Sequence, residues 1–253
     1  MNTRSLRTLL LAGAATMVLA GCASNRTTSM ESPDFSGLSR VEAQATLDQL
    51  AVRYKQNPKD KATVIHFAAA LRANDQPEQA VAVLEAGMAA HRGDRDLAVA
   101  YAKALAAAGR FQQGLAVVEG AIDPALPDWN ALSVKGAILD QSGRNEEARR
   151  CYQQALQIAP GEASLYANLG LSYAMTNDLA EAEVQLRKAV RLPGANSRIR
   201  QNLALVVGLQ GRFDESKAMF TADLAPDQVD ANMAYIRALL TQQNRWDLIK
   251  GAE

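Results

Sequence analysis

Few residues of this chain have the type and spacing that catalysis or metal binding requires. His66 and His91 are the only histidines, and neither has a second ligand type at metal-site spacing. His66 adjoins Phe67, which we expect to face the core, so we interpret His66 as a packing or surface residue. No Ser/His/Asp set, glycine-rich phosphate loop or carboxylate pair occurs in a supporting context. We therefore expect no enzymatic activity, no metal or other cofactor, and no small-molecule substrate.

The N-terminus has the features of a targeting segment. Two arginines and no acid precede an apolar run at residues 9–20, which is too short to span a bilayer as a helix. The run leads into Leu19-Ala20-Gly21-Cys22, a quartet that resembles a bacterial lipobox. The resemblance implies that residues 1–21 are a lipoprotein signal peptide and that Cys22 becomes the mature, acylated N-terminus, carrying palmitate or similar chains. An ordinary secretory peptide with a coincidental cysteine is the alternative.

Sorting and redox state follow from the same segment. Ala23, rather than Asp, comes after Cys22, and by resemblance to Gram-negative lipoproteins this implies a lipid anchor in the outer membrane, facing the periplasm. Cys151 is then the only remaining thiol, so no intramolecular disulfide is expected. It precedes Tyr152 in a helical pattern, and we interpret it as a small apolar filler. An intermolecular disulfide is the alternative.

Charge gives no sign of a nucleic-acid partner. The chain has 27 basic and 27 acidic residues, and no basic stripe stands out along it. The run Arg144–Arg150 (RNEEARR) pairs opposite charges at helical spacing, which is typical of a solvated helix face.

The elements that would position any site recur every 34 residues. The spacing predicts five helix hairpins, at residues 61–94, 95–128, 129–162, 163–196 and 197–230, with a sixth, partial unit at 231–253. The eighth residue of each unit should face the partner helix, where only small side chains allow close approach: Ala68, Ala102, Gly136, Gly170, Ala204 and Ala238. Each first helix should end at a left-handed residue: Asp75, Gly109, Gly143, Asn177 and Gly211.

The segments before the first hairpin have different patterns. Residues 22–37 are rich in Ser, Thr and Asn and lack periodicity, so they are expected to form a flexible, lipidated tether. Residues 38–60 predict a leading helix that stops before Pro58. Its packed side should carry Val41, Ala45, Leu47, Leu50, Ala51 and Tyr54.

The third unit identifies the repeat. It has a small, small, aromatic, small, proline pattern in Gly136, Ala148, Tyr152, Ala155 and Pro160. This pattern resembles the tetratricopeptide repeat (TPR). The resemblance implies an all-α TPR solenoid of antiparallel helix hairpins, with about five and a half repeats and a leading helix. The outer units depart from the pattern, since Gly114 replaces the usual Ala, and Arg200 and Asp223 occupy positions where apolar or small residues are expected.

Binding of a protein partner is the expectation for such a fold. In TPR arrays the second, fifth, ninth, twelfth and thirteenth residues of each unit line the concave face. In the third unit these are Asn130, Ser133, Ala137, Asp140 and Gln141. In later units they include an apolar strip bordered by polar residues, for which we hypothesise an apolar or amphipathic peptide as ligand. This candidate groove comprises Asn168, Leu171, Met175, Arg198, Asn202, Leu205, Leu209, Asn232 and Tyr235. The alternative is that the C-terminal helix folds over part of the strip.

The C-terminal segment TADLAPDQVDANMAYIRALLTQQNRWDLI adds a second resemblance. On a TPR chain with a lipobox, this ending resembles the TPR lipoprotein of tight-adherence (Tad/Flp) pilus systems. The resemblance implies a lipoprotein that helps a secretin ring reach or assemble in the outer membrane and so permits secretion of Flp pili. The alternative is a general envelope adaptor, or a pilotin-like lipoprotein of type IV pili, that docks other cell-envelope proteins.

Overall fold

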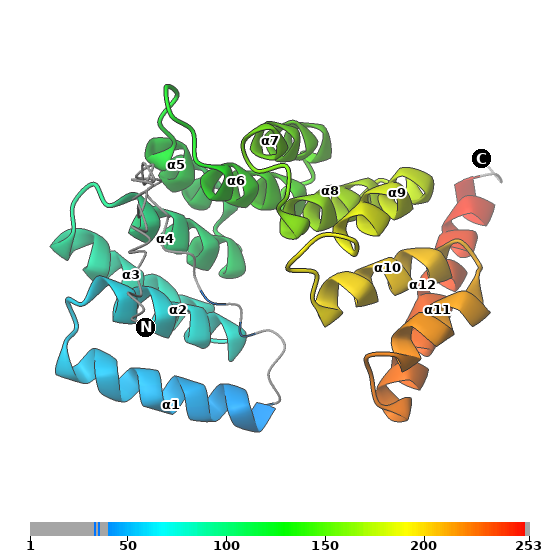
Figure 1. Cartoon of the computed structure of the whole chain (residues 1–253), viewed down its shortest axis with the longest axis horizontal. Helices are drawn as coiled ribbons and strands as arrows, with labels where there is room; N and C mark the ends of the chain where they lie inside the picture. Colours follow the sequence, from blue (N-terminus) through cyan, green and yellow to red (C-terminus); the bar gives the residue numbers. More distant parts are fainter. Residues whose placement is uncertain (1–32, 34, 36–39, 251–253) are drawn as a thin grey trace, which may run out of the picture.

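The computed structural model describes residues 33, 35 and 40–250, and within this range the chain forms twelve helices and no strand (Figure 1). Residues 1–21 and Cys22 lie outside the described residues. The helices are α1 (Arg40–Gln56), α2 (Lys61–Ala73), α3 (Pro77–Ala90), α4 (Arg95–Ala107), α5 (Phe111–Ala121), α6 (Trp129–Gln141), α7 (Asn145–Ile158), α8 (Ala163–Met175), α9 (Leu179–Ala189), α10 (Ser197–Leu209), α11 (Phe213–Thr221) and α12 (Pro226–Lys250).

The helices from α2 to α11 form five antiparallel hairpins. The first helix of each hairpin begins 34 residues after the previous one, so that α2, α4, α6, α8 and α10 occupy equivalent places in the stack. Figure 1 shows this stack curving into an arch, with α1 at one end and α12 at the other. The predicted all-α solenoid of about five and a half repeats with a leading helix is confirmed.

Capping side chains fix where each first helix begins. Asp60 accepts a hydrogen bond from the Thr63 amide at 2.8 Å. The residue just before each later first helix caps it in the same way: Asp94, Asp128, Glu162 and Asn196. This row of acceptors also recurs every 34 residues, a signal in the sequence that marks the start of each hairpin in addition to the small residues and the turns.

The turns inside the hairpins have the predicted left-handed backbone. Gly109, Gly143 and Gly211 have φ between 74° and 83°, while Asp75 and Asn177 have φ of 56° and 62°. Glycine adopts this conformation without a steric penalty, and Asp and Asn tolerate it better than most residues. The chain can therefore reverse direction immediately after each first helix.

Small residues at the eighth position let the two helices of a hairpin approach closely, as predicted. A Cβ added to Gly136 would lie 2.6 Å from Cε1 of Tyr152 on α7. One added to Gly170 would lie 2.8 Å from Cγ of Leu186 on α9. Ala238 is an exception, because it is exposed. It lies on α12, which is one continuous helix without a hairpin partner, so the prediction for this residue was wrong.

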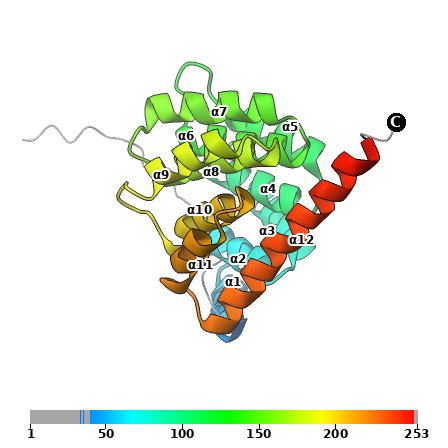
Figure 2. The same cartoon turned by 90° about the vertical axis from the view of Figure 1, so that its right-hand side faces the viewer.

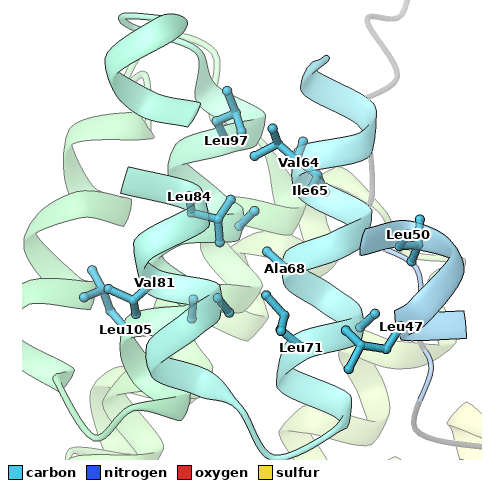
Figure 3. Packing of buried hydrophobic residues seen from close by; sticks show 14 residues of the cluster. Leu47, Leu50, Val64, Ile65, Ala68, Leu71, Val81, Leu84, Leu97 and Leu105 are labelled. Carbon is cyan, nitrogen blue, oxygen red and sulfur yellow. The ribbon is translucent and has the colours of Figure 1, made fainter. Parts of the chain in front are cut away.

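The leading helix α1 covers the first hairpin. Leu47 and Leu50 face α2 and join a cluster that continues through α3 and α4 (Figure 3). Tyr54 stacks on Phe67 with ring centroids 5.1 Å apart. Two residues assigned to the packed side are instead exposed, namely Val41, at 80%, and Ala45. The packed stripe of α1 runs through positions 43, 47, 50 and 54, which follow helical spacing, and residues 41 and 45 fall beside it.

Ion pairs join the fourth and fifth hairpins. Glu183 on α9 accepts a hydrogen bond from Arg212 Nη1 at 2.8 Å and one from Gln210 Nε2 at 2.8 Å. Burial disfavours the charged carboxylate, but the hydrogen bonds from Arg212, Gln210 and Arg187 outweigh it and lower the pKa of Glu183 to about 2. Glu183 therefore stays ionised and links the two repeats across the neutral pH range.

Candidate partner-binding groove

A cavity of about 550 Å³ lies on the concave side of the arch and extends across all five first helices. We call it the concave groove. The first helices α2, α4, α6, α8 and α10 line it, and no second helix does. Its helical lining is Ala69, Arg72, Ala73, Lys103, Ala106, Ala107, Trp129, Asn130, Ser133, Val134, Ala137, Ile138, Gln141, Ser164, Ala167, Asn168, Leu171, Arg198, Ile199 and Asn202, with Asn196 just before α10.

The repeat period determines which side chains reach this groove. Four of the five groove positions expected in the third repeat line it, and so do three in the fourth repeat: Asn130, Ser133, Ala137 and Gln141, then Ser164, Ala167 and Leu171. Because every first helix occupies an equivalent place in the stack, equivalent positions turn towards the same side. The ninth position of the first two repeats, Ala69 and Lys103, follows the same rule.

Basic and amide side chains dominate the polar part of the lining. Arg72, Lys103 and Arg198 supply positive charge, and none of the lining residues is Asp or Glu. Amides and hydroxyls from α6 and α8 hydrogen-bond across the helices, since Asn168 Nδ2 donates to Ser133 Oγ at 3.2 Å. Lys103 Nζ lies 3.5 Å from Asn130 Oδ1. Side chains of this kind can bond to the backbone of an extended peptide and attract acidic groups on it.

The structure divides the predicted apolar strip. Leu171 lines the concave groove, whereas Met175 is 60% exposed and lies outside the lining. Leu205 and Leu209 pack against the cluster that α12 forms with α10 and α11. The strip is therefore not one continuous surface. Of its four apolar residues, only Leu171 lines the concave groove.

Helix α12 accounts for this division. It crosses α10 and α11 at the end of the array (Figure 2) and buries Val229, Met233 and Ile236 against them. The alternative that the C-terminal helix covers part of the strip thus describes Leu205 and Leu209 correctly. The sequence alone leaves both possibilities open, because helical periodicity does not specify which neighbour a terminal helix packs against.

The remaining predicted groove residues are also split between the two regions. Asn168, Arg198 and Asn202 line the concave groove. Asn232 and Tyr235 belong to α12 and do not line it; Asn232 Nδ2 donates to the carbonyl of Gln228 in its own helix at 2.9 Å. Tyr235 is 58% exposed. The two α12 residues therefore present a separate surface at the C-terminal end.

Asp140 was expected to line the groove, but it is buried in a polar network between α6, α7 and α8. Its carboxylate accepts hydrogen bonds from Tyr152 Oη at 3.0 Å, Ser172 Oγ at 2.7 Å and Asn145 Nδ2 at 2.8 Å. Burial, together with the nearby Asp140 charge, raises the pKa of the Tyr152 phenol, which keeps its proton. Next to this network, Arg149 donates to the carbonyl of Ser172 at 3.2 Å. The network fixes α6 against α8.

The other residues considered for chemistry have structural surroundings. Cys151 is buried beside Tyr152, and burial raises the pKa of its thiol, in keeping with the role of a packing residue. His91 Nε2 lies 2.7 Å from the carbonyl oxygen of Lys59, and His66 is half-buried. In the described part of the chain, no three His, Cys, Asp or Glu residues cluster so as to hold a metal. None of the helices described is both long and apolar enough to cross a membrane.

Known proteins resemble this chain in its repeats. Residues 130–193 match the model of the tetratricopeptide repeat family. An uncharacterised protein of Sinorhizobium fredii is 37% identical over 84 residues, which are 33% of this chain and 46% of that protein. Anaphase-promoting complex subunit 7 of Mus musculus is 30% identical over 142 residues, covering 54% of this chain and 25% of the relative. The chain thus spans less than half the length of either relative.

Solved structures share the architecture. A thermophilic TPR protein of Thermus thermophilus superposes with a TM-score of 0.61 at 23% identity, over 74% of this chain and 99% of that protein. A TPR protein of Parabacteroides merdae gives a TM-score of 0.66 at 10% identity over 78% of each chain. The fold is therefore a TPR α-solenoid.

Proposed function

We propose that this chain is an outer-membrane lipoprotein that faces the periplasm and holds a protein partner in its concave groove. The proposed partner is a secretin, or another component of pilus assembly in a tight-adherence (Tad/Flp) secretion system. On this proposal the chain assists secretin assembly and so permits pilus display. Cys22 carries the lipid anchor, and the solenoid provides the binding surface.

The observation that carries the binding role is the composition of the concave groove. It extends across five repeats, has three basic side chains and no acidic one, and contains amides already oriented by hydrogen bonds. An extended segment of a partner could lie along the first helices and bond to these amides through its backbone. The lipobox and the C-terminal resemblance support the membrane and pilus parts of the proposal.

A charge substitution in the groove tests the binding role. In a strain that lacks the chromosomal gene, Leu171→Glu should reduce secretin multimers, pilus display and co-purification of the secretin. Val184→Glu is the matched control, because Val184 is an exposed apolar residue on α9, outside the groove. Leu205 is unsuitable for this test, since it packs against the α12 cluster and its replacement would also disturb folding.

Three outcomes would overturn separate parts of the proposal. If deletion of the gene leaves secretin multimers and pilus display unchanged, the pilus assignment fails, and an envelope adaptor with other partners takes its place. If Leu171→Glu co-purifies with the secretin as well as Val184→Glu does, the groove is not the binding surface. If Cys22→Ser still sediments with membranes, the lipid anchor is wrong.

A further inference from the structure

Two residues that precede the first helix lie in the concave groove. Pro33 and Phe35 line the same cavity as α2, α4 and α6, and both are half-buried. Phe35 also packs against the apolar cluster of the first two repeats. The sequence predicts a flexible tether over residues 22–37, but Pro33 and Phe35 within it line the groove, and Phe35 packs on the solenoid.

The part of the groove that α2 and α4 line has mostly small side chains. These are Ala69, Ala73, Ala106 and Ala107, and Phe35 packs on the apolar cluster of the same two helices. Trp129 adds a second aromatic side chain to the lining. An aromatic ring inserted among alanines buries a large apolar area without displacing a larger side chain.

The sequence around Phe35 also complements the charge of the groove. The segment reads Glu31-Ser32-Pro33-Asp34-Phe35, with two acids and no base. The groove lining has basic residues on α2, α4 and α10 and no acidic residue. A free peptide of this sequence therefore carries a charge opposite to that of the groove lining.

We propose that the segment carrying Pro33 and Phe35 is an intramolecular ligand of the concave groove, and that the partner contributes an extended acidic peptide with an aromatic residue near a proline, which displaces it. The proposal rests on the proposed partner-binding function and adds the chemical class of the ligand. Pro33 and Phe35 then occupy part of the groove until a peptide of the same kind competes for it.

The effect of this competition on the affinity for a separate peptide can be estimated. A segment joined by a short linker has an effective concentration of about 1 mM at its site. If the segment binds with an intrinsic dissociation constant of about 0.1 mM, a separate copy of it meets a groove that is open about one tenth of the time. Removing the internal ligand should therefore strengthen binding of the separate peptide about tenfold.

The test uses the full chain and a fluorescein-labelled peptide of residues 29–39 (SMESPDFSGLS). Fluorescence anisotropy should show that the Phe35→Ala variant binds this peptide about tenfold more tightly than the unmodified chain does. Leu126→Ala removes a similarly large apolar side chain from an exposed site outside the groove and should leave the affinity unchanged. A labelled peptide with alanine in place of the phenylalanine should bind neither variant.

A second measurement keeps the proposal open to refutation if Phe35→Ala perturbs the fold. Trp129 shares the cavity with Phe35, so excess unlabelled peptide should change its emission in the Phe35→Ala variant, studied with Trp246→Phe to leave one tryptophan. Equal peptide affinity of the unmodified chain and Phe35→Ala would overturn the proposal. Failure of the peptide to bind both the unmodified chain and Phe35→Ala would also overturn it. If Leu171→Glu nevertheless reduces co-purification of the secretin, the proposed partner-binding function is retained and only the intramolecular ligand is rejected.

Discussion

Gly136→Ala is a direct test of the close helix approach in the third repeat. The added methyl group would lie 2.6 Å from Cε1 and 2.8 Å from Cζ of Tyr152. Contacts this short require the ring to move, but Tyr152 is only 2% exposed and its hydroxyl donates to Asp140 at 3.0 Å. Overpacking of this kind costs about 1–3 kcal/mol, and loss of the hydrogen bond adds about 1 kcal/mol. The greater helix propensity of alanine offsets up to about 1 kcal/mol of this loss of stability.

The free energy of unfolding should therefore fall by about 2 kcal/mol in urea melts followed by circular dichroism. Gly120→Ala is the matched control, because Gly120 is an exposed residue of α5 with no atom within 4 Å of the added Cβ, and it should stabilise slightly. Tyr152→Leu should rescue Gly136→Ala in part, since Ala68 and Leu84 hold the equivalent places in the first repeat and both are buried. Equal stability of Gly136→Ala and Gly120→Ala would refute the reasoning.

Charged pairs and turns offer further tests. Alanine at Arg200 and Asp223, singly and together, should reveal a coupling energy of about 1 kcal/mol in a double-mutant cycle, because the pair is bidentate but the Arg200 side chain is 45% exposed; additive losses would contradict this. Asp75→Gly should raise the free energy of unfolding by about 0.5–1 kcal/mol, since Asp75 has φ of 56°, and a decrease would show that its side chain outweighs the strain. The pKa of Glu183 is lowered from 4.5 to about 2, so its stabilisation is complete above pH 4.5 and is lost as the pH falls towards 2. At neutral pH the free energy of unfolding of the unmodified chain should exceed that of Glu183→Gln by at most about 3 kcal/mol. The difference should be smaller than this limit because Arg212 is partly exposed to solvent. A difference that stays constant on acidification would be inconsistent with this pKa.

The hairpins could be predicted from the sequence because their determinants are local. A left-handed turn at Gly143 or Asn177 depends on one residue's backbone preference, and that preference recurs with the period. A small residue such as Gly136 indicates that the two helices of a hairpin approach closely at that position. Both signals lie within one repeat, so a single sequence with several copies is sufficient to find them.

Arg200 and Asp223 form an ion pair that the 34-residue period alone does not predict. They occupy the fourth and twenty-seventh positions of the fifth repeat, where the third repeat has Leu132 and Ala155 packed in one apolar cluster. Each residue alone is a departure from the TPR pattern, but the Arg200 guanidinium donates to both carboxylate oxygens of Asp223, at 2.8 and 2.6 Å. The two replacements therefore complement each other, and this relation is visible in the sequence only when the two positions are compared as a pair.

Non-local packing could not be predicted in the same way. Whether α12 covers Leu205 and Leu209 depends on how a single terminal helix packs against its neighbours. The placement of Phe35 is a further case, because neither helical periodicity nor a repeat extends to that segment. In both cases the decisive contact joins segments outside the five full repeats to the array.

The polar residues of the third and fourth repeats form an internal hydrogen-bond network and part of the lining of the concave groove. Asp140 is buried, and its bonds to Tyr152 and Ser172 join α6 to α7 and α8. Ser133 and Asn168 line the concave groove, and their mutual hydrogen bond at 3.2 Å joins α6 to α8, the same two helices that the Asp140–Ser172 bond joins. A peptide in the groove would therefore meet polar side chains whose positions are already set, and these side chains would lose less conformational entropy when the peptide binds. On the proposed function, the buried Asp140 carboxylate supports binding by holding together the two helices, α6 and α8, whose side chains face the peptide.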